Sequence, residues 1–249
     1  IGSISIIDAA GPMSHQHRIP CTLMRGGTSR GPFFLSSHLP HDPRERDALL
    51  ISAMGAGHEL QVDGIGGGNP LTSKVAIVSK SDQPGVDVNY LFAQVGIEKG
   101  IVDTNPSCGN MLAGIGPYAI ETGLVSAEEG ETKVNIYNVN TQSMIEAVVQ
   151  TPNKRVNYQG SAEIDGVPGS SAPIFLNFTD VCGSKTSGLL PTGKVIEKID
   201  GIDASCVDVA MPMVLFRATD FGITGYETRD EIAENKKLFE MMEIGRAHV

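Results

Sequence analysis

The segment Asn-Pro-Ser-Cys-Gly-Asn at residues 105–110 carries the strongest chemical signal in the sequence. An apolar stretch with helical spacing follows it, so Cys108 is predicted to lie at the start of a helix over 109–122. Free amides and the dipole at a helix start favour a thiolate, and they can also hold a carboxylate or an enolate. A buried structural cysteine is the commoner fate of this residue type. Because proline, serine, glycine and asparagine are poor core neighbours, we interpret Cys108 as a reactive, partly exposed thiol.

Lys74 is the second residue that could do chemistry. It follows a glycine-rich stretch at 63–73 and directly precedes an apolar strand predicted over 75–79. A lysine in this position can be partly desolvated, which favours the neutral amine that acts as a base. A surface lysine whose aliphatic stem packs on the strand is the alternative, and Lys74 alone does not exclude it.

Two arginines, Arg25 and Arg30, enclose the segment Gly-Gly-Thr-Ser at 26–29. Two guanidinium groups around a turn with free amides and hydroxyls suit the binding of a carboxylate. Ordinary surface arginines fit the same spacing equally well.

Two segments resemble nucleotide-binding motifs, but each lacks a residue that the motif requires. Residues 64–69 resemble a dinucleotide fingerprint, but Asn69 stands where the third glycine belongs and no Val/Ile-rich strand leads into it. Residues 188–194 resemble a phosphate-binding loop, but Val195 replaces the Ser/Thr that would hold magnesium, and Pro191 removes an amide. We therefore predict that neither segment binds a nucleotide.

The cysteines and histidines show no metal-ligand spacing. No CxxC pair occurs, which predicts neither a zinc site nor a disulfide framework and favours a reducing cytoplasm. We expect no metal and no other cofactor. Cys21 and Cys206 lie in apolar strands and are expected in the core, Cys182 is uninformative, and His15, His17, His38, His41 and His58 are expected to be solvated.

Composition restricts the partners. Of 249 residues, 29 are acidic and 19 basic, and the net charge of −10 argues against a nucleic-acid or anionic-membrane partner. No apolar run approaches the roughly 20 residues of a membrane span. No basic region precedes the first short apolar stretch, so a secretory signal is not indicated. A small-molecule partner is expected, and a homodimer is left open.

The elements that must position these residues follow from periodicity, caps and turns. Strands are predicted at 19–25, 32–36, 75–79, 87–95, 132–139, 144–151 and 173–179; helices at 42–54, 111–122 and 228–242. The helix at 111–122 is rich in small residues, which is typical of a helix buried on several sides. We therefore expect a sheet wrapped around one buried helix.

A weak internal repeat links 21–40 with 206–223, since both pass from a strand through a turn into an aromatic strand. The second copy would begin a second domain after a linker near 183–187. Met13 is the first methionine, so residues 1–13 are interpreted as a non-native leader. The last helical pattern stops without a C-cap, and residues 243–249 are interpreted as an artefactual tail of a truncated chain.

Three motifs together resemble the PrpF family, which includes 2-methylaconitate isomerase and 4-oxalomesaconate tautomerase. They are MRGGTSRGPFF at 24–34, DGIGGGNPLTSKVAIV at 63–78 and NPSCGNML at 105–112. LPTGK at 190–194 and the stretch at 208–227 extend the resemblance, which covers about 18–242. Arg30 replaces a lysine common in that turn, and Met211 stands where asparagine is expected.

The resemblance implies an α+β, diaminopimelate epimerase-like fold, with a sheet wrapped around a central helix in each of two similar domains. The N-terminal domain would cover 14–184 and an incomplete second domain 185–242. Such proteins move a double bond by proton transfer in an unsaturated tricarboxylate without metal or redox cofactor. Lys74 and Cys108 are the implied acid/base pair. The implied substrate-binding residues are Arg25, Gly27, Thr28, Ser29, Arg30, Asn69, Ser73, Ser107, Gly109, Asn110, Met111 and Thr192.

The residue chemistry agrees with an isomerase or tautomerase of the 4-oxalomesaconate or 2-methylaconitate type, because abstracting a proton beside a carboxylate needs a base and groups that hold the resulting charge. Two alternatives remain. An amino-acid epimerase or racemase of the same fold would need a second cysteine opposite Cys108, and Cys206 lacks a glycine-rich helix start. The chain could also be an inactive carboxylate-binding fragment. The sequence does not identify which tricarboxylate is the substrate.

Overall fold

A computed structural model describes residues 2–7, 16–179, 182–183, 185–209 and 211–246. The chain folds into two compact units, Ile1–Thr179 and Asp180–Val249, which are treated separately below. The division falls close to the linker predicted near 183–187.

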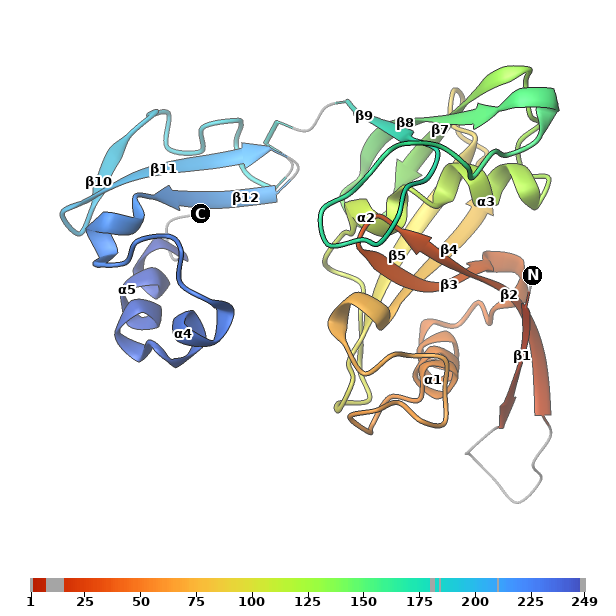
Figure 1. Ribbon diagram of the computed structural model, residues 1–249, viewed down its shortest axis with the longest axis horizontal. Coiled ribbons are helices and arrows are strands. Elements are labelled where there is room, and N and C mark those ends of the chain that lie inside the picture. The colour runs from red at the N-terminus through yellow and green to blue at the C-terminus, as the bar shows by residue number, and fades with distance from the viewer. Residues whose placement is uncertain (1, 8–15, 180–181, 184, 210, 247–249) are drawn as a thin grey trace. The chain divides into compact units, whose positions relative to one another are not determined.

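The first unit is built on one mixed sheet (Figure 1). Its described strands follow the order β1-β2-β3-β4-β5-β7-β8-β9, with β6 paired to β5. The β3–β4 and β5–β7 pairs are parallel and the others antiparallel. The bounds are β1 Gly2–Ile7, β2 Gln16–Gly26, β3 Ser29–Leu35, β4 Lys74–Lys80, β5 Val88–Val95, β6 Val102–Asp103, β7 Gly130–Asn138, β8 Ser143–Thr151 and β9 Ile174–Phe178.

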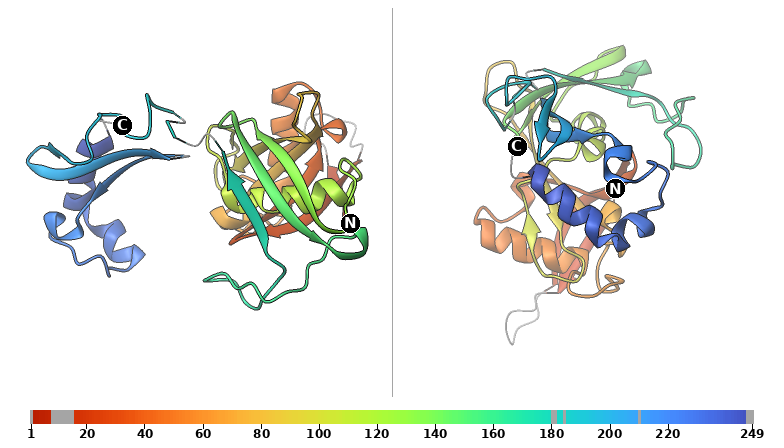
Figure 2. Two further views of the ribbon diagram at one scale, coloured as in Figure 1. Left: turned by 90° about the horizontal axis from the view of Figure 1, so that it is seen from above. Right: turned by 90° about the vertical axis from the view of Figure 1, so that its left-hand side faces the viewer.

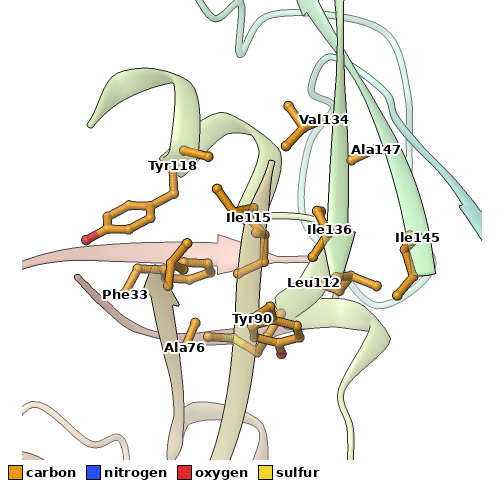
Figure 3. Packing of buried hydrophobic residues seen from close by; sticks show 14 of the residues in the cluster. Phe33, Ala76, Tyr90, Leu112, Ile115, Tyr118, Val134, Ile136, Ile145 and Ala147 are labelled. Atoms are coloured by element: carbon orange, nitrogen blue, oxygen red, sulfur yellow. The ribbon is translucent and has the colours of Figure 1, made fainter. Parts of the chain in front are cut away.

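Helices bury both faces of this sheet. One face packs on α2 (Gly109–Leu112) and α3 (Ile115–Glu121), and the other packs on α1 (Pro43–Met54). Side chains of a strand point alternately to opposite faces, so β4 sends Ala76 and Val78 to the α3 core, and Val75 and Ile77 to the α1 core. Figure 3 shows the α3 core, in which strand residues such as Tyr90, Ile136 and Ala147 surround Ile115. The α+β class and the sheet wrapped around a buried helix are confirmed.

The first helix has the cap that its sequence predicts. The Asp42 carboxylate accepts the amides of Arg44 and Glu45 at 2.9 and 3.1 Å, and Pro43 occupies the first turn. Gly55 ends the helix with a left-handed φ of 68°.

The helix predicted over 109–122 is two helices with a break at Ala113 and Gly114. The amides of both residues bond the carbonyl three residues back, at 3.3 and 3.0 Å. Pro117 causes this break, because a proline has no amide to bond the carbonyl four residues back, and its ring crowds that carbonyl. Gly114 then lies directly against Phe33, where an added Cβ would be 2.6 Å from the ring.

The second unit holds a three-stranded antiparallel sheet and two helices. The strands are β10 Glu197–Ile199, β11 Ile202–Val209 and β12 Met211–Phe216, and the helices are α4 Arg229–Glu234 and α5 Lys236–Arg246. Thr228 and Glu231 form a capping box at the start of the helix predicted from residue 228. The helix predicted to continue to 242 is interrupted at Asn235, whose side chain accepts the amide of Leu238 at 3.0 Å and so starts a new helix.

The weak internal repeat has a local structural counterpart. The β2–β3 hairpin pairs Leu23 with Pro32, and the β11–β12 hairpin pairs Asp208 with Pro212. A 3₁₀ turn follows each hairpin, at Ser36–His38 and at Ala218–Phe221. A helix with a capped start comes next in both units, α1 in the first and α4 in the second. By their orange and blue colours, the two helices can be followed in Figure 2.

Candidate active site

Most of the predicted site residues gather at one end of the first sheet, where β2 and β5 end and β3 and β4 begin. The turn 26–29, the glycine-rich loop before β4 and the segment leading into α2 meet there. The Asn110 side chain donates to Thr28 Oγ1 at 2.9 Å across 82 residues of sequence. The fold thus brings the three motifs together.

Two glycines allow the turn 26–29 to lie against the start of α2. A Cβ on Gly26 would collide with the Asn110 carbonyl, and one on Gly27 would collide with the Asn110 side chain. Gly27 also has a left-handed φ of 52°. A residue with a side chain at Gly26 would therefore push the turn away from α2.

Cys108 is the N-cap residue of α2. Its Sγ accepts the amide of Met111 at 3.5 Å and lies 4.0 Å from Ser29 Oγ. Cys108 is only 8% exposed, so the prediction of a partly exposed cysteine is wrong. The side chain turns inward to cap the helix and packs beside Met111. A helix of four residues also has little dipole, which weakens that part of the sequence argument.

Polar groups of neighbouring strands hold the segment before α2. The Tyr90 hydroxyl donates to the Cys108 carbonyl at 3.3 Å. Burial and then charge on Cys108 raise the pKa of Tyr90 well above its usual range, so this donor keeps its proton. The buried Asn138 amide donates to Ser107 Oγ at 2.7 Å. Gly109, which follows, borders open space.

Lys74 lies on the α3 side of the sheet, the side that also holds Cys108. Its Nζ donates to Gln94 Oε1 at 2.8 Å and lies 5.1 Å from the centre of the Phe92 ring. Gln94 in turn donates to the Ser73 carbonyl at 2.9 Å. The amine is partly buried and is held by neutral groups, as a base positioned for proton transfer would be. Among the described residues, no hydrogen bond joins Lys74 directly to Cys108.

A buried glutamine organises the glycine-rich loop. Gln61 Oε1 accepts Ser73 Oγ at 2.6 Å and the Gly68 amide at 3.0 Å. Asn69 caps the 3₁₀ turn Pro70–Thr72 by accepting the Leu71 amide at 2.9 Å. Ser73 and Asn69 thus support the shape of the loop that leads to Lys74.

Arg25 and Arg30 are paired between β2 and β3, and their guanidinium groups contact different segments of the chain. Arg25 donates to the Gly27 carbonyl at 2.7 Å and to Ser171 Oγ at 3.1 Å. Arg30 Nη2 lies 3.0 Å from where a Cβ of Gly67 would be, next to the glycine-rich loop. Arg30 Nε is buried and has no partner among the described groups. Thr192 lies in the second unit and is exposed.

Sequence reasoning missed four residues that position this site, namely Gln61, Tyr90, Gln94 and Asn138. Gln94 and Asn138 stand near the ends of predicted strands, where polar residues interrupt the apolar pattern. A polar residue near the end of a predicted strand was therefore the sequence signal that could have identified Gln94 and Asn138. Gln61 gave none, because its role depends on the folded loop.

No group of three or more His, Cys, Asp or Glu side chains that could hold a metal occurs among the described residues. In the same part of the chain, no helix is long and apolar enough to cross a membrane.

Comparison with known proteins assigns the family. The model of the PrpF protein family matches residues 16–248. The chain belongs to the PrpF family. A relative named "Putative isomerase YbhH", from Escherichia coli (strain K12), is 53% identical over 226 residues, which are 91% of this chain and 65% of that protein. The (4E)-oxalomesaconate Delta-isomerase of Novosphingobium sp. (strain KA1) is 49% identical over 92% of this chain and 64% of its own length.

A solved structure has the same fold as this chain. The crystal structure of methylitaconate-delta-isomerase superposes with a TM-score of 0.80 at 42% identity, covering 93% of this chain and 61% of that one. The chain thus spans a little under two thirds of the relatives that it matches. The family match includes 243–248, and the 91% coverage of this chain lends the predicted truncation no support.

Proposed function

We propose that this PrpF-family protein is a cofactor-independent isomerase that moves a carbon–carbon double bond in an unsaturated polycarboxylate. The observation that carries the proposal is the gathering of Lys74, Cys108 and three glycine-containing segments at one end of the sheet. Relatives named as isomerases of oxalomesaconate and methylitaconate support the reaction class.

The chemistry requires one proton to leave and one to return. A base removes a proton from the carbon next to the double bond, and the electron pair spreads into a dienolate that the adjacent carboxylate stabilises. An acid then returns a proton at the other end of the three-carbon unit, so the double bond moves and the atoms balance. Lys74 and Cys108 are the proposed acid/base pair, with the direction of each transfer open.

Substrate carboxylates need cationic and amide partners. Arg30 is the favoured cation, because its guanidinium lies by the glycine-rich loop and its buried Nε has no described partner. Thr28, Asn110 and the amide of Gly109 offer further hydrogen bonds at the turn 26–29 and the start of α2. Met111, Asn69, Ser73 and Ser107 are proposed to shape the site, and Thr192 of the second unit stays a prediction.

The epimerase alternative is less well supported. It would need a second thiol that faces the substrate, but Cys206 is fully buried within β11. Burial, followed by the charge of Glu197, also raises the pKa of that thiol, which disfavours its reactive form.

The test is proton NMR in D₂O with 4-oxalomesaconate, 2-methylaconitate and 3-methylitaconate as candidate substrates. Conversion of any one with deuterium uptake at the exchanged carbon supports the isomerase. Saturable binding without turnover or exchange by the folded chain supports the carboxylate-binding fragment instead. Exchange at a carbon bearing an amino group, measured with amino acids, would favour the epimerase.

The cellular setting is part of the proposal. The net charge of −10 and the absence of paired cysteine motifs support a cytoplasmic location, a small carboxylate as partner, and neither nucleic acid nor membrane. The homodimer stays a prediction, which light scattering of the purified protein can test.

A further inference from the structure

A hollow of about 340 Å³ lies on the face of the first sheet that packs on α1. It is lined by Ile77 of β4, which belongs to the α1 core, and by Ser79 near the far end of that strand. Ser79 is five residues from Lys74, about 17 Å along an extended strand. Cys108 belongs to the core on the other face, and none of the residues assigned above to the proposed active site lines this hollow. The sheet and most of the length of β4 therefore separate the hollow from that site.

Neutral polar side chains form one wall of the hollow. The strand register places Ser79 opposite Asn89, and Asn89 opposite Tyr137, so these three side chains point to the same face in one row across β4, β5 and β7. Ser36 and Gln83 add a hydroxyl and an amide from the connecting segments. The wall thus offers hydrogen-bond donors and acceptors without a formal charge.

An apolar row lies directly beside this polar wall. Ile77 pairs with Leu91 two residues along the same two strands, and Leu39 and Pro40 contribute from the segment before α1. Apolar surface beside neutral hydrogen-bonding groups matches a molecule with a C–H face and several hydroxyl groups. The volume of the hollow falls within the roughly 300–1,000 Å³ of typical small-molecule sites.

Asn89 is poorly bonded within the protein. Its Nδ2 lies 3.4 Å from Ser79 Oγ and 3.5 Å from the Lys80 carbonyl, both beyond the usual range of about 2.7–3.2 Å. Its buried Oδ1 has no hydrogen-bond partner among the described residues, although buried polar atoms nearly always have one. An ionised carboxylate has no donor for this oxygen, whereas a hydroxyl group both donates and accepts.

The charged groups near the hollow compensate each other. Arg46 lines it, but its Nε and Nη2 bond the Asp47 carboxylate at 2.9 and 2.8 Å. His41 also lines the hollow and is exposed, where water competes for its ring nitrogens. A neutral ligand therefore fits this hollow better than an anion.

We propose that this hollow binds a neutral cyclic polyol of monosaccharide size. After a turn of the Asn89 side chain, one hydroxyl donates to its Oδ1, and others bond the hydroxyls of Ser79 and Tyr137. The C–H face of the ring lies against Ile77 and Leu91, where the burial of apolar surface adds affinity. The inference does not depend on the isomerase assignment.

The probe is methyl β-D-glucopyranoside, observed by saturation-transfer NMR with the folded chain. Saturable binding is expected, and Asn89→Leu, which keeps the size but removes the amide, should weaken it by at least about five-fold, the scale of a lost hydrogen bond. Asn177→Leu, which removes an exposed asparagine from β9 of the same sheet, is the matched control and should leave binding unchanged. Methyl β-D-glucuronide, the carboxylate counterpart, should bind no more tightly, and 2-methoxytetrahydropyran, the ring without hydroxyls, should not bind.

Further measurements locate the site. Ser79→Phe should fill the hollow and abolish binding, and 3-methylitaconate should not compete with the sugar. Circular dichroism checks each fold, and Tyr137→Phe, which removes only a hydroxyl, replaces Asn89→Leu if that variant unfolds. The proposal is overturned if the glucoside does not bind, if the two asparagine variants bind alike, if the glucuronide binds more tightly, or if 3-methylitaconate competes. Isomerase activity is assayed separately, so sugar binding without that activity would refute the proposed function and leave this inference standing.

Discussion

Lys74 is held by a neutral amide and an aromatic ring, at 2.8 and 5.1 Å. If it is the base, Lys74→Met should lower kcat by about 100-fold or more, the usual scale for a lost general base. Lys80→Met, at the exposed far end of the same strand, is the matched control and should keep normal turnover. Steady-state kinetics on the best substrate measures both, and near-normal turnover in Lys74→Met would remove it from the mechanism.

The four cysteines should differ in their reaction with iodoacetamide. Cys182 is exposed and should react first, and Cys108, 8% exposed, should follow. Burial raises the pKa of the Cys21 and Cys206 thiols, so they carry less thiolate at any pH below that value and should react last.

Peptide mass mapping of the folded protein gives this order, and trans-aconitate should slow Cys108 without changing Cys182. If Cys108 reacts no faster than Cys21, or if trans-aconitate leaves it unprotected, the thiol does not take part in the proposed site.

At the scale of elements, the contact between the turn 26–29 and α2 can be broken by one methyl group. Gly26→Ala would place a Cβ against the Asn110 carbonyl, and it should lower the free energy of unfolding by about 1–3 kcal/mol, as overpacking does. Gly109→Ala is the matched control, because its Cβ would enter open space. Urea denaturation compares the two, and equal stability would show that the turn moves freely.

Local sequence patterns predicted most elements of the first unit. Half-buried strands have alternating apolar and polar residues, and helix starts have recognisable capping residues. Asp42 and Pro43 marked the start of α1 in the sequence, and the structure ends the helix at Gly55. The helix break was also visible in principle, since Pro117 was present in the sequence, but the small residues around it suggested a continuous buried helix instead.

The site was predicted in chemistry but not in geometry. Lys74 and Cys108 stand in recognisable motifs, whereas Gln94 reaches Lys74 only through strand pairing and Asn138 reaches Ser107 across 31 residues. The inward direction of the Cys108 thiol depends on its role as a cap, and the different neighbours of the Arg25 and Arg30 head groups depend on the fold. Such non-local contacts have no local sequence signal.

At the scale of the whole molecule, alkaline pH should destabilise the fold. Burial raises the pKa of Tyr118 to about 12 and that of Tyr90 well above its usual 10.0. Above pH 10 the unfolded chain releases protons that the folded chain keeps, so the unfolded state is favoured as pH rises. The loss should begin near pH 9, where the thiol of unfolded Cys21 also titrates.

Urea denaturation between pH 8 and 11 measures the slope with which the free energy of unfolding falls as the pH rises. Tyr118→Phe keeps the ring that packs 5.6 Å from Phe33 and should make the slope shallower, whereas Tyr226→Phe, at a residue 94% exposed, should not. An unchanged slope in Tyr118→Phe would show that its hydroxyl titrates freely in the folded protein.

The closeness of Thr28 to Asn110 has a consequence during protein synthesis. The turn leaves the ribosome about 80 residues before its partner, a delay on the order of 4–16 s at typical elongation rates. During that interval Gly26, Gly27 and the neighbouring apolar edge of the nascent hairpin stay exposed, because α2 has not yet been synthesised. A pause in translation between residues 31 and 108 should therefore lengthen the time for which a chaperone can bind this hairpin, and synonymous slow codons placed there should increase chaperone capture without altering the finished protein.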